Sequence, residues 1–118
     1  MEKTILVIDD EKNIRTLFEE EFKEAGFSVI ATDDGHEALK ILDRQKIDLI
    51  TLDIKMPKMD GIEFLGKVRE KHKHLPIIIC TAYDNYRQEF SVWSADSYVL
   101  KSADMSEIKE KINKIIGQ

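Results

Sequence analysis

The chain has 118 residues, a mass of 13.7 kDa and a formal net charge of -5 at pH 7. This length suits one domain, which we expect to span residues 1–118. The acidic balance argues against general binding to nucleic acid or anionic membranes, because both are polyanions. No apolar run approaches the roughly 18 residues of a membrane span, no signal peptide precedes the first apolar run, and the single cysteine, Cys80, excludes an internal disulfide. We therefore expect a soluble, cytoplasmic protein.

Five short apolar runs alternate with amphipathic helical patterns. The first run, Thr4–Ile8, is continuous and β-branched, which predicts a strand buried on both faces. A helix is predicted over Lys12–Ala25, and Gly26 follows at the position that commonly ends helices. The next run, Phe27–Thr32, alternates in the manner of an edge strand.

The middle of the chain continues the same alternation. A helix is predicted over Asp34–Arg44, capped by Asp33 or Asp34. A short buried strand, Leu49–Leu52, is followed by a loop and by a helix from about Asp60 to Lys73.

The last third repeats the pattern twice. Ile77–Thr81 predicts a buried strand, Asp84–Trp93 a weaker helix and Tyr98–Leu100 a brief strand. We expect Asp104 to open the final helix, with Glu107 completing a capping box.

This order predicts an α/β fold, a flavodoxin-like (βα)5 unit with a parallel five-stranded sheet and helices on both faces. The first, third and fourth strands are the most apolar, so they belong in the interior of the sheet. This placement suits the strand order 2-1-3-4-5, in which the second and fifth strands form the edges.

Charged and hydroxyl side chains gather where the strands are predicted to end. The first strand ends in an acidic triplet at residues 9–11, the third in Asp53, the fourth in Thr81 and the fifth in Lys101. Functional sites of such sheets lie beyond the carboxyl ends of the strands. We therefore expect these side chains to meet in one place.

The expected cluster suits phosphoryl transfer. Carboxylates held close together repel one another, and a divalent cation such as Mg²⁺, which prefers oxygen ligands, relieves that repulsion. Lys101 would pair with Asp53 at rest and hold a phosphoryl oxygen after reaction, while Thr81 would donate a hydrogen bond to another oxygen. Asp53 is then the candidate carboxylate nucleophile.

The chain resembles the receiver domain of bacterial two-component response regulators along essentially its whole length, and within that family the stand-alone receivers of chemotaxis and sporulation phosphorelays. The matching features are Ile8-Asp9-Asp10-Glu11, the segment LDIKMPKMDG at residues 52–61, Thr81-Ala82, Tyr98 and Lys101.

The resemblance implies a role for each matching residue. Asp53 would accept a phosphoryl group from a phosphohistidine of a sensor histidine kinase or a histidine phosphotransfer protein. Mg²⁺ would be bound by the residues that follow the first and third strands: Asp10, Asp53, the backbone carbonyl of Lys55, and Asp9 directly or through water. Thr81 and Lys101 would hold the phosphoryl oxygens.

The resemblance also implies a switch. Thr81 would move toward the phosphoryl group and vacate space that Tyr98 fills by turning inward. The surface of the fourth helix, fifth strand and fifth helix would then bind a downstream protein. We expect a signalling switch, not an enzyme in the ordinary sense, that catalyses its own Mg²⁺-dependent phosphorylation and dephosphorylation, as a monomer or a weak phosphorylation-dependent dimer.

Two further positions would tune the lifetime of the phosphoryl group. Lys55 lies two residues after Asp53, and Tyr83 lies two after Thr81, so both would flank the path of water to the phosphorus. The same pair occurs in the stand-alone sporulation phosphorelay receiver. We expect slow hydrolysis.

The chain departs from the family at two places. Ser102 follows Lys101 where the family usually has a proline in a cis peptide. Because a cis bond to a non-proline residue costs about 2.5–4 kcal/mol, we expect a trans bond with a remodelled loop, or a strained cis bond. Ser94-Ala95 replaces the usual Gly-Ala, which predicts a displaced end of the fourth helix.

Other protein classes fit less well. An aspartyl-phosphate phosphatase needs a second Asp where this chain has Lys55, and a flavin carrier needs a phosphate-binding loop where it has the acidic triplet. A receiver-like module that is never phosphorylated would usually lack Asp53 or Lys101, and both are present. The sequence leaves open whether the chain is a stand-alone receiver or the receiver fragment of a longer DNA-binding regulator.

Overall fold

The structure is a computed structural model that describes residues 2–54, 56, 58–82, 95–101 and 104–117. The strands are β1 (Thr4–Ile8), β2 (Ser28–Thr32), β3 (Leu49–Leu52), β4 (Ile77–Thr81) and β5 (Ser97–Leu100), and the helices are α1 (Lys12–Glu24), α2 (Gly35–Arg44), α3 (Gly61–Lys71) and α5 (Ser106–Ile116). The helix predicted over Asp84–Trp93 lies outside the described residues. None of the described helices is long and apolar enough to cross a membrane.

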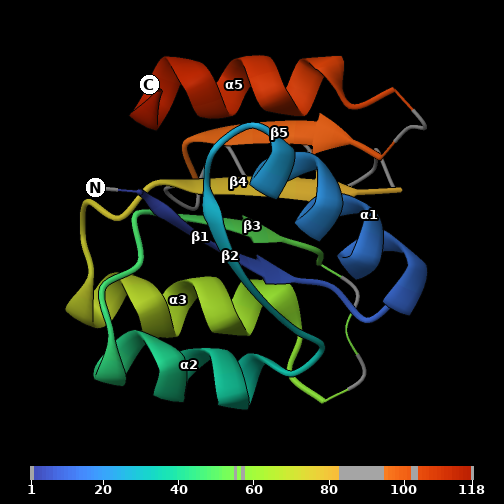
Figure 1. Cartoon of the computed structure of the whole chain (residues 1–118). Helices are drawn as coiled ribbons and strands as arrows, with labels where there is room; N and C mark the ends of the chain where they lie inside the picture. Colours follow the sequence, from blue (N-terminus) through green and yellow to red (C-terminus); the bar gives the residue numbers. More distant parts are fainter. Residues whose placement is uncertain (1, 55, 57, 83–94, 102–103, 118) are drawn as a thin grey trace.

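The five strands form one parallel sheet in the order β2-β1-β3-β4-β5, which confirms the predicted order. Helices α2 and α3 cover one face of the sheet, and α1 and α5 cover the other (Figure 1). β1, β3 and β4 lie inside the sheet and are its most buried strands, whereas β2 and β5 form the edges and are partly exposed. The apolar content of each run therefore predicted the place of its strand.

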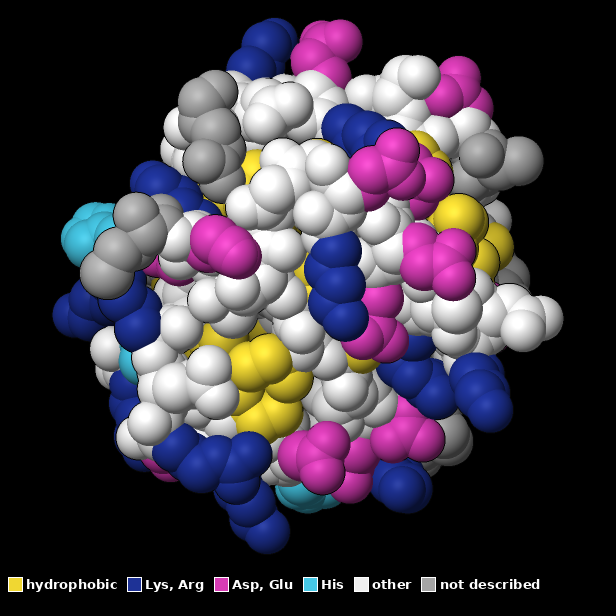
Figure 2. Space-filling view, in the orientation of Figure 1, with side chains coloured by type: hydrophobic (Ala, Val, Ile, Leu, Met, Phe, Trp, Pro, Cys, Tyr) yellow, Lys and Arg dark blue, Asp and Glu magenta, His cyan; other side chains and the backbone are white. Residues whose placement is uncertain are grey.

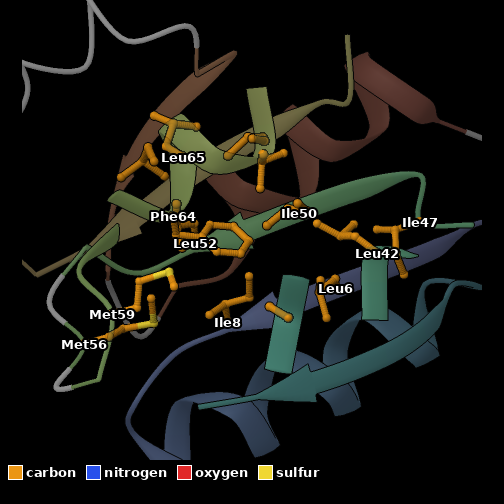
Figure 3. Packing of buried hydrophobic residues seen from close by; sticks show 14 of the residues in the cluster. Leu6, Ile8, Leu42, Ile47, Ile50, Leu52, Met56, Met59, Phe64 and Leu65 are labelled. Atoms are coloured by element: carbon orange, nitrogen blue, oxygen red, sulfur yellow. The ribbon is translucent and has the colours of Figure 1, made fainter. Parts of the chain in front are cut away.

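Each face of the sheet has its own hydrophobic core. Successive side chains of a strand point to opposite faces, so Leu6 and Ile8 pack toward α2 and α3 (Figure 3), whereas Ile5 and Val7 pack toward α1 and α5. Cys80 is buried in the second core, as expected, and burial raises the pKa of its thiol to about 12.

The helix ends follow local sequence signals at three of four predicted positions. Asp34 caps α2 by accepting from the His36 N–H at 2.9 Å, and Asp60 caps α3 by accepting from the Ile62 N–H at 2.7 Å. Gly26 adopts a φ of 100°, which the chain needs to turn back after α1.

The predicted start of the last helix is wrong. α5 begins at Ser106, with Met105 as its N-cap residue, and no side chain caps it. Asp104 instead accepts hydrogen bonds from the Ser106 N–H at 2.8 Å and the Ser106 hydroxyl at 2.6 Å. Asp104 thus closes a local turn before the helix, as Asp side chains commonly do, and Met105 takes the N-cap position predicted for Asp104.

The surface carries charges of both signs. Figure 2 shows acidic and basic side chains interspersed over the visible face, with hydrophobic side chains there in small groups. On this face the acidic side chains therefore do not form a separate patch without basic neighbours.

Candidate functional site

Four strand ends converge at the carboxyl edge of the sheet. Asp9 follows β1, Asp53 follows β3, Thr81 ends β4 and Lys101 follows β5. The Asp53 N–H donates to the Ile8 carbonyl at 2.9 Å, and the Lys101 N–H donates to the Thr81 carbonyl at 2.7 Å. These bonds extend the strand ladders by one residue, so the register of the sheet places the functional side chains.

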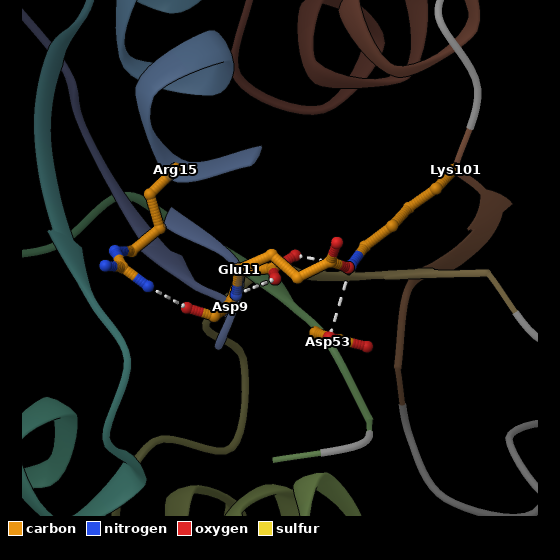
Figure 4. Close-up of polar contacts among 5 residues, drawn as sticks. All are labelled: Asp9, Glu11, Arg15, Asp53 and Lys101. Carbon is orange, nitrogen blue, oxygen red and sulfur yellow. Dashed lines mark hydrogen bonds and ion pairs between the residues drawn. The ribbon is translucent and has the colours of Figure 1, made fainter. Parts of the chain in front are cut away.

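The Lys101 ammonium lies among three carboxylates (Figure 4). Its Nζ is 2.8 Å from Asp9 Oδ2, 3.2 Å from Asp53 Oδ2 and 3.1 Å from Glu11 Oε1. The side chains of Asp9 and Asp53 are only 3% and 5% exposed. The ion pair expected between Lys101 and Asp53 is therefore present, and it is part of a larger cluster.

The cluster shifts the pKa of its members. Burial, together with repulsion from Asp9, raises the pKa of Asp53 to about 6 in spite of the nearby Lys101. Burial also raises the pKa of Asp9. Burial by itself would lower the pKa of Lys101, but the hydrogen bond and charge of Asp9 and the charge of Asp53 outweigh it and raise that pKa. One ammonium therefore does not neutralise the two buried carboxylates.

The donor set fits a small, hard dication. One carboxylate oxygen from each of the four acidic residues, Asp9, Asp10, Glu11 and Asp53, lies within 4.8 Å of the others. Asp9 and Asp53 are buried, whereas Asp10 and Glu11 are exposed. The cluster therefore combines two buried carboxylates with two that are accessible to solvent. An all-oxygen carboxylate set of this kind suits Mg²⁺. Lys55, whose carbonyl was expected as a further ligand, lies outside the described residues.

Thr81 and Tyr98 lie on the same face of the sheet. Thr81 is fully buried at the end of β4, two residues beyond Ile79. Tyr98 is directly opposite Ile79 in the β4–β5 pair, and both belong to the core on the side of α2 and α3. This shared face is what the expected switch requires. Tyr83 and the peptide bond from Lys101 to Ser102 lie outside the described residues, as does Ser94.

Gly61 supports the backbone beside Asp53. Its N–H donates to the Ile54 carbonyl at 2.8 Å. A Cβ at Gly61 would lie 2.7 Å from Ile54 Cα and 2.9 Å from the Asp53 carbonyl oxygen, distances that real side chains do not reach. The start of α3 therefore packs against the backbone that carries Asp53, and only glycine permits this approach.

Sequence reasoning missed two contacts of this site. Glu11 was recognised as part of the acidic triplet but not as a partner of Lys101. Arg15 was treated only as a helix residue, yet its Nη1 donates to the Asp9 carbonyl at 2.8 Å. The available signal was a helix whose first four residues include two basic side chains and no acidic one, contrary to the usual preference.

Comparison with known proteins places the chain in a family. The model of the response regulator receiver domain matches residues 5–113. The chain therefore belongs to the response regulator receiver domains, as its fold and its strand-end cluster indicate.

The curated relatives include proteins of two lengths. The chain is 38% identical over 121 residues to the alkaline phosphatase synthesis transcriptional regulatory protein PhoP of Bacillus subtilis, with 98% of this chain but 49% of PhoP covered. It is 34% identical over 118 residues to sporulation initiation phosphotransferase F of the same organism, with 98% and 95% covered. The chain thus spans about half of the first relative and nearly all of the second.

Solved structures match over nearly the whole chain. Response regulator protein TrrA from Thermotoga maritima, in complex with Mg²⁺ and BeF, is 47% identical with a TM-score of 0.91, covering 96% of this chain and 98% of TrrA. TrrA in complex with histidine kinase ThkA is 46% identical with a TM-score of 0.89, covering 97% and 98%. Chemotaxis protein CheY4 from Vibrio cholerae is 27% identical with a TM-score of 0.91, covering 98% and 99%.

Proposed function

We propose that this receiver is a phosphorylation switch that takes a phosphoryl group onto Asp53 from a phosphohistidine of a sensor kinase or phosphotransfer protein. The observation that carries the proposal is the Lys101 ammonium held between the buried carboxylates of Asp9 and Asp53. A buried acidic pair with only one cation favours an incoming dication and a group that this dication can neutralise.

The reaction uses groups that the strand ends supply. A carboxylate oxygen of Asp53 attacks the phosphorus, a new O–P bond forms, and the P–N bond to the histidine breaks with its electron pair left on the imidazole nitrogen. Lys101 binds one phosphoryl oxygen and the Thr81 hydroxyl donates to another. Such positioning and charge neutralisation are the main needs of phosphoryl transfer.

The proposed metal ligands are Asp9, Asp10, Asp53 and the backbone carbonyl of Lys55. Bound by these ligands, Mg²⁺ would supply positive charge that neutralises the phosphoryl oxygens. The TrrA structure with Mg²⁺ and BeF supports Mg²⁺ as the bound cation, because TrrA is 47% identical to this chain.

The same site would also act on small phosphodonors and on its own product. Because the groups that position the phosphoryl group belong to this chain, we propose that it catalyses its own phosphorylation and dephosphorylation. Lys55 and Tyr83 remain the predicted residues that slow hydrolysis by obstructing the path of water.

Phosphorylation would be read out through Thr81 and Tyr98. A phosphoryl group adds about 1.5 to 2 negative charges and three acceptor oxygens. Thr81 moves toward these oxygens, and Tyr98, on the same face of the sheet, turns into the space that Thr81 leaves. The surface formed by the fourth helix, β5 and α5 then binds a downstream protein.

The partners follow from the proposed chemistry. A histidine kinase is supported by the structure of TrrA with ThkA, and a phosphorelay by the likeness to sporulation initiation phosphotransferase F. The likeness to PhoP supports instead a receiver within a longer transcriptional regulator. A cytoplasmic location stays a prediction from the sequence.

Intact-protein mass spectrometry tests the proposal. Incubation with phosphoramidate and Mg²⁺ should add one phosphate to the protein, and Asp53→Asn should abolish the adduct. Asp43→Asn, an exposed carboxylate on α2, is the matched control and should react like the wild type. An unmodified wild type would support the phosphorylation-independent binding module instead. An adduct that persists in Asp53→Asn would show that another residue accepts the phosphoryl group, which contradicts the role proposed for Asp53.

A further inference from the structure

Three hydrogen bonds hold the backbone around the peptide that joins Asp9 to Asp10, and one of them is made by the carbonyl of that peptide. The Asp9 N–H donates to the Thr32 carbonyl at 3.1 Å, and Asp9 Oδ1 accepts from the Glu11 N–H at 2.9 Å. The Asp9 carbonyl accepts from Arg15 Nη1 at 2.8 Å, as Figure 4 illustrates. These bonds fix the backbone from which the Asp10 side chain extends.

Arg15 takes the place of a strand partner. In a parallel ladder that continued past Ile8 and Thr32, the Asp9 carbonyl would accept from the Asp34 N–H. That N–H donates instead to the Thr32 hydroxyl at 3.2 Å. The guanidinium, reaching back from the start of α1, supplies the donor that the sheet no longer provides.

The start of a helix is an electrostatically unfavourable place for the positive charge of Arg15. Arg15 and Lys12 both lie at the start of α1, where the helix dipole disfavours positive charge. A guanidinium beside the acidic cluster also repels an incoming dication. Charge alone therefore predicts that Arg15 weakens metal binding, whereas its hydrogen bond organises the backbone at that site.

We propose that Arg15 is a positioning residue for the metal site: its hydrogen bond to the Asp9 carbonyl sets the plane of the Asp9–Asp10 peptide and thereby aims the Asp10 carboxylate at the cation. Because a trans peptide is planar, fixing its carbonyl also fixes the direction of the Asp10 N–H and Cα. This inference rests on the proposed function, because Asp10 is a metal ligand only in that reading.

The direction in which the Mg²⁺ affinity changes distinguishes a positioning role of Arg15 from an effect of its charge alone. Isothermal titration calorimetry gives the Mg²⁺ dissociation constant of the wild type, Arg15→Ala, Arg15→Gln, Arg15→Lys and the control Lys12→Ala. Loss of an outer-shell partner typically weakens metal binding by about 10- to 100-fold. We therefore expect about tenfold weaker binding in Arg15→Ala, partial recovery in Arg15→Lys, and slightly tighter binding in Lys12→Ala, which removes the same charge from the exposed side of α1.

A second readout does not need the metal. In the metal-free protein the amide chemical shift of Asp10 should move in Arg15→Ala and Arg15→Gln but not in Lys12→Ala. If Arg15→Ala does not fold, Arg15→Gln and Arg15→Lys carry the comparison. Arg15 variants that bind Mg²⁺ as tightly as the wild type, or more tightly, and leave the Asp10 amide unchanged would overturn the inference. A wild type that binds no Mg²⁺ would instead overturn the proposed function.

Discussion

Lys101 Nζ lies 2.8 Å from Asp9 Oδ2, although β3 and β4 separate their two strands in the sheet. Neighbouring strands are about 4.8 Å apart, so both side chains must lean across the carboxyl edge of the sheet to meet. Asp53, which follows β3 between them, is 3.2 Å from the same ammonium. Lys101 thus links the edge strand β5 to the inner strands β1 and β3 through contacts within the functional site.

Loss of Lys101 should destabilise the metal-free protein. In Lys101→Met, Asp9 and Asp53 remain buried without their cation, and breaking a buried ion pair in this way costs about 3–5 kcal/mol. Urea unfolding at pH 7 without divalent ions measures the change. Lys58→Met removes an exposed cation 3.9 Å from Asp34 and should cost about 0–1 kcal/mol. Equal losses in the two variants would contradict the importance of the buried cluster.

The stability of the metal-free protein should fall as the pH rises through the titration of Asp53. Its pKa is raised from 3.8 to about 6, so between these values the folded state binds more protons than the unfolded state. The free energy of unfolding therefore decreases with rising pH in this window. Asp53→Asn should equal the wild type near pH 3.5 and exceed it by about 3 kcal/mol at pH 7.5.

Chemical unfolding of both proteins across this pH range tests the sign. Saturating Mg²⁺ should remove the advantage of Asp53→Asn at pH 7.5, because a bound dication favours the ionised carboxylate. A wild type that gains stability relative to Asp53→Asn between pH 4 and 6 in the absence of metal would show that Asp53 is not a destabilised carboxylate.

A methyl group at Gly61 should impair the site more than the fold. In Gly61→Ala, the Cβ would lie 2.7 Å from Ile54 Cα, so the backbone beside Asp53 must shift. We expect a loss of about 1–3 kcal/mol in stability. We also expect the reaction with phosphoramidate to be slower by about tenfold or more, because the Asp53 carboxylate would no longer be held in the orientation that the reaction needs.

Gly66 provides the matched control, since a Cβ there meets nothing within 4 Å. Gly66→Ala, in the interior of α3, should stabilise the protein by about 0.5–1 kcal/mol and leave the phosphorylation rate unchanged. If the phosphorylation rate falls equally in both alanine variants, the close contact at Gly61 is not the cause of the slower reaction.

Asp96 should stabilise the start of β5, at the end of the sheet opposite to the carboxyl ends of the strands. Its Oδ2 accepts from the Ile77 N–H at 2.8 Å and lies 3.4 Å from Arg69 Nη2. Asp96→Ala leaves the buried Ile77 N–H without this acceptor, which costs about 1–3 kcal/mol. Asp43→Ala, which removes one partner of an exposed pair with Lys71, should cost less than about 1 kcal/mol by thermal or urea unfolding.

Local sequence patterns predicted the order and type of the described elements well. Thr4–Ile8, Leu49–Leu52 and Ile77–Thr81 were predicted with their observed ends, because buried strands read as continuous apolar runs between polar residues. The start of α5 was predicted wrongly, since Asp104 suits both a cap and a turn, and only the path of the chain into α5 selects one.

The candidate site also has features that the sequence predicted and features that only the tertiary structure decided. Residue types at the strand ends were enough to indicate acidic chemistry at Asp9 and Asp53 and a nearby cation at Lys101, because parallel strands bring their carboxyl ends to one edge. The partnership of Glu11 with Lys101 depends on the distance between two elements far apart in the chain. The reach of Arg15 to the Asp9 carbonyl and the close approach of Gly61 to Ile54 join residues near in the chain, and they depend on the angle at which each helix leaves its strand. Such distances follow from how the helices pack on the sheet, and no periodicity in the sequence encodes them.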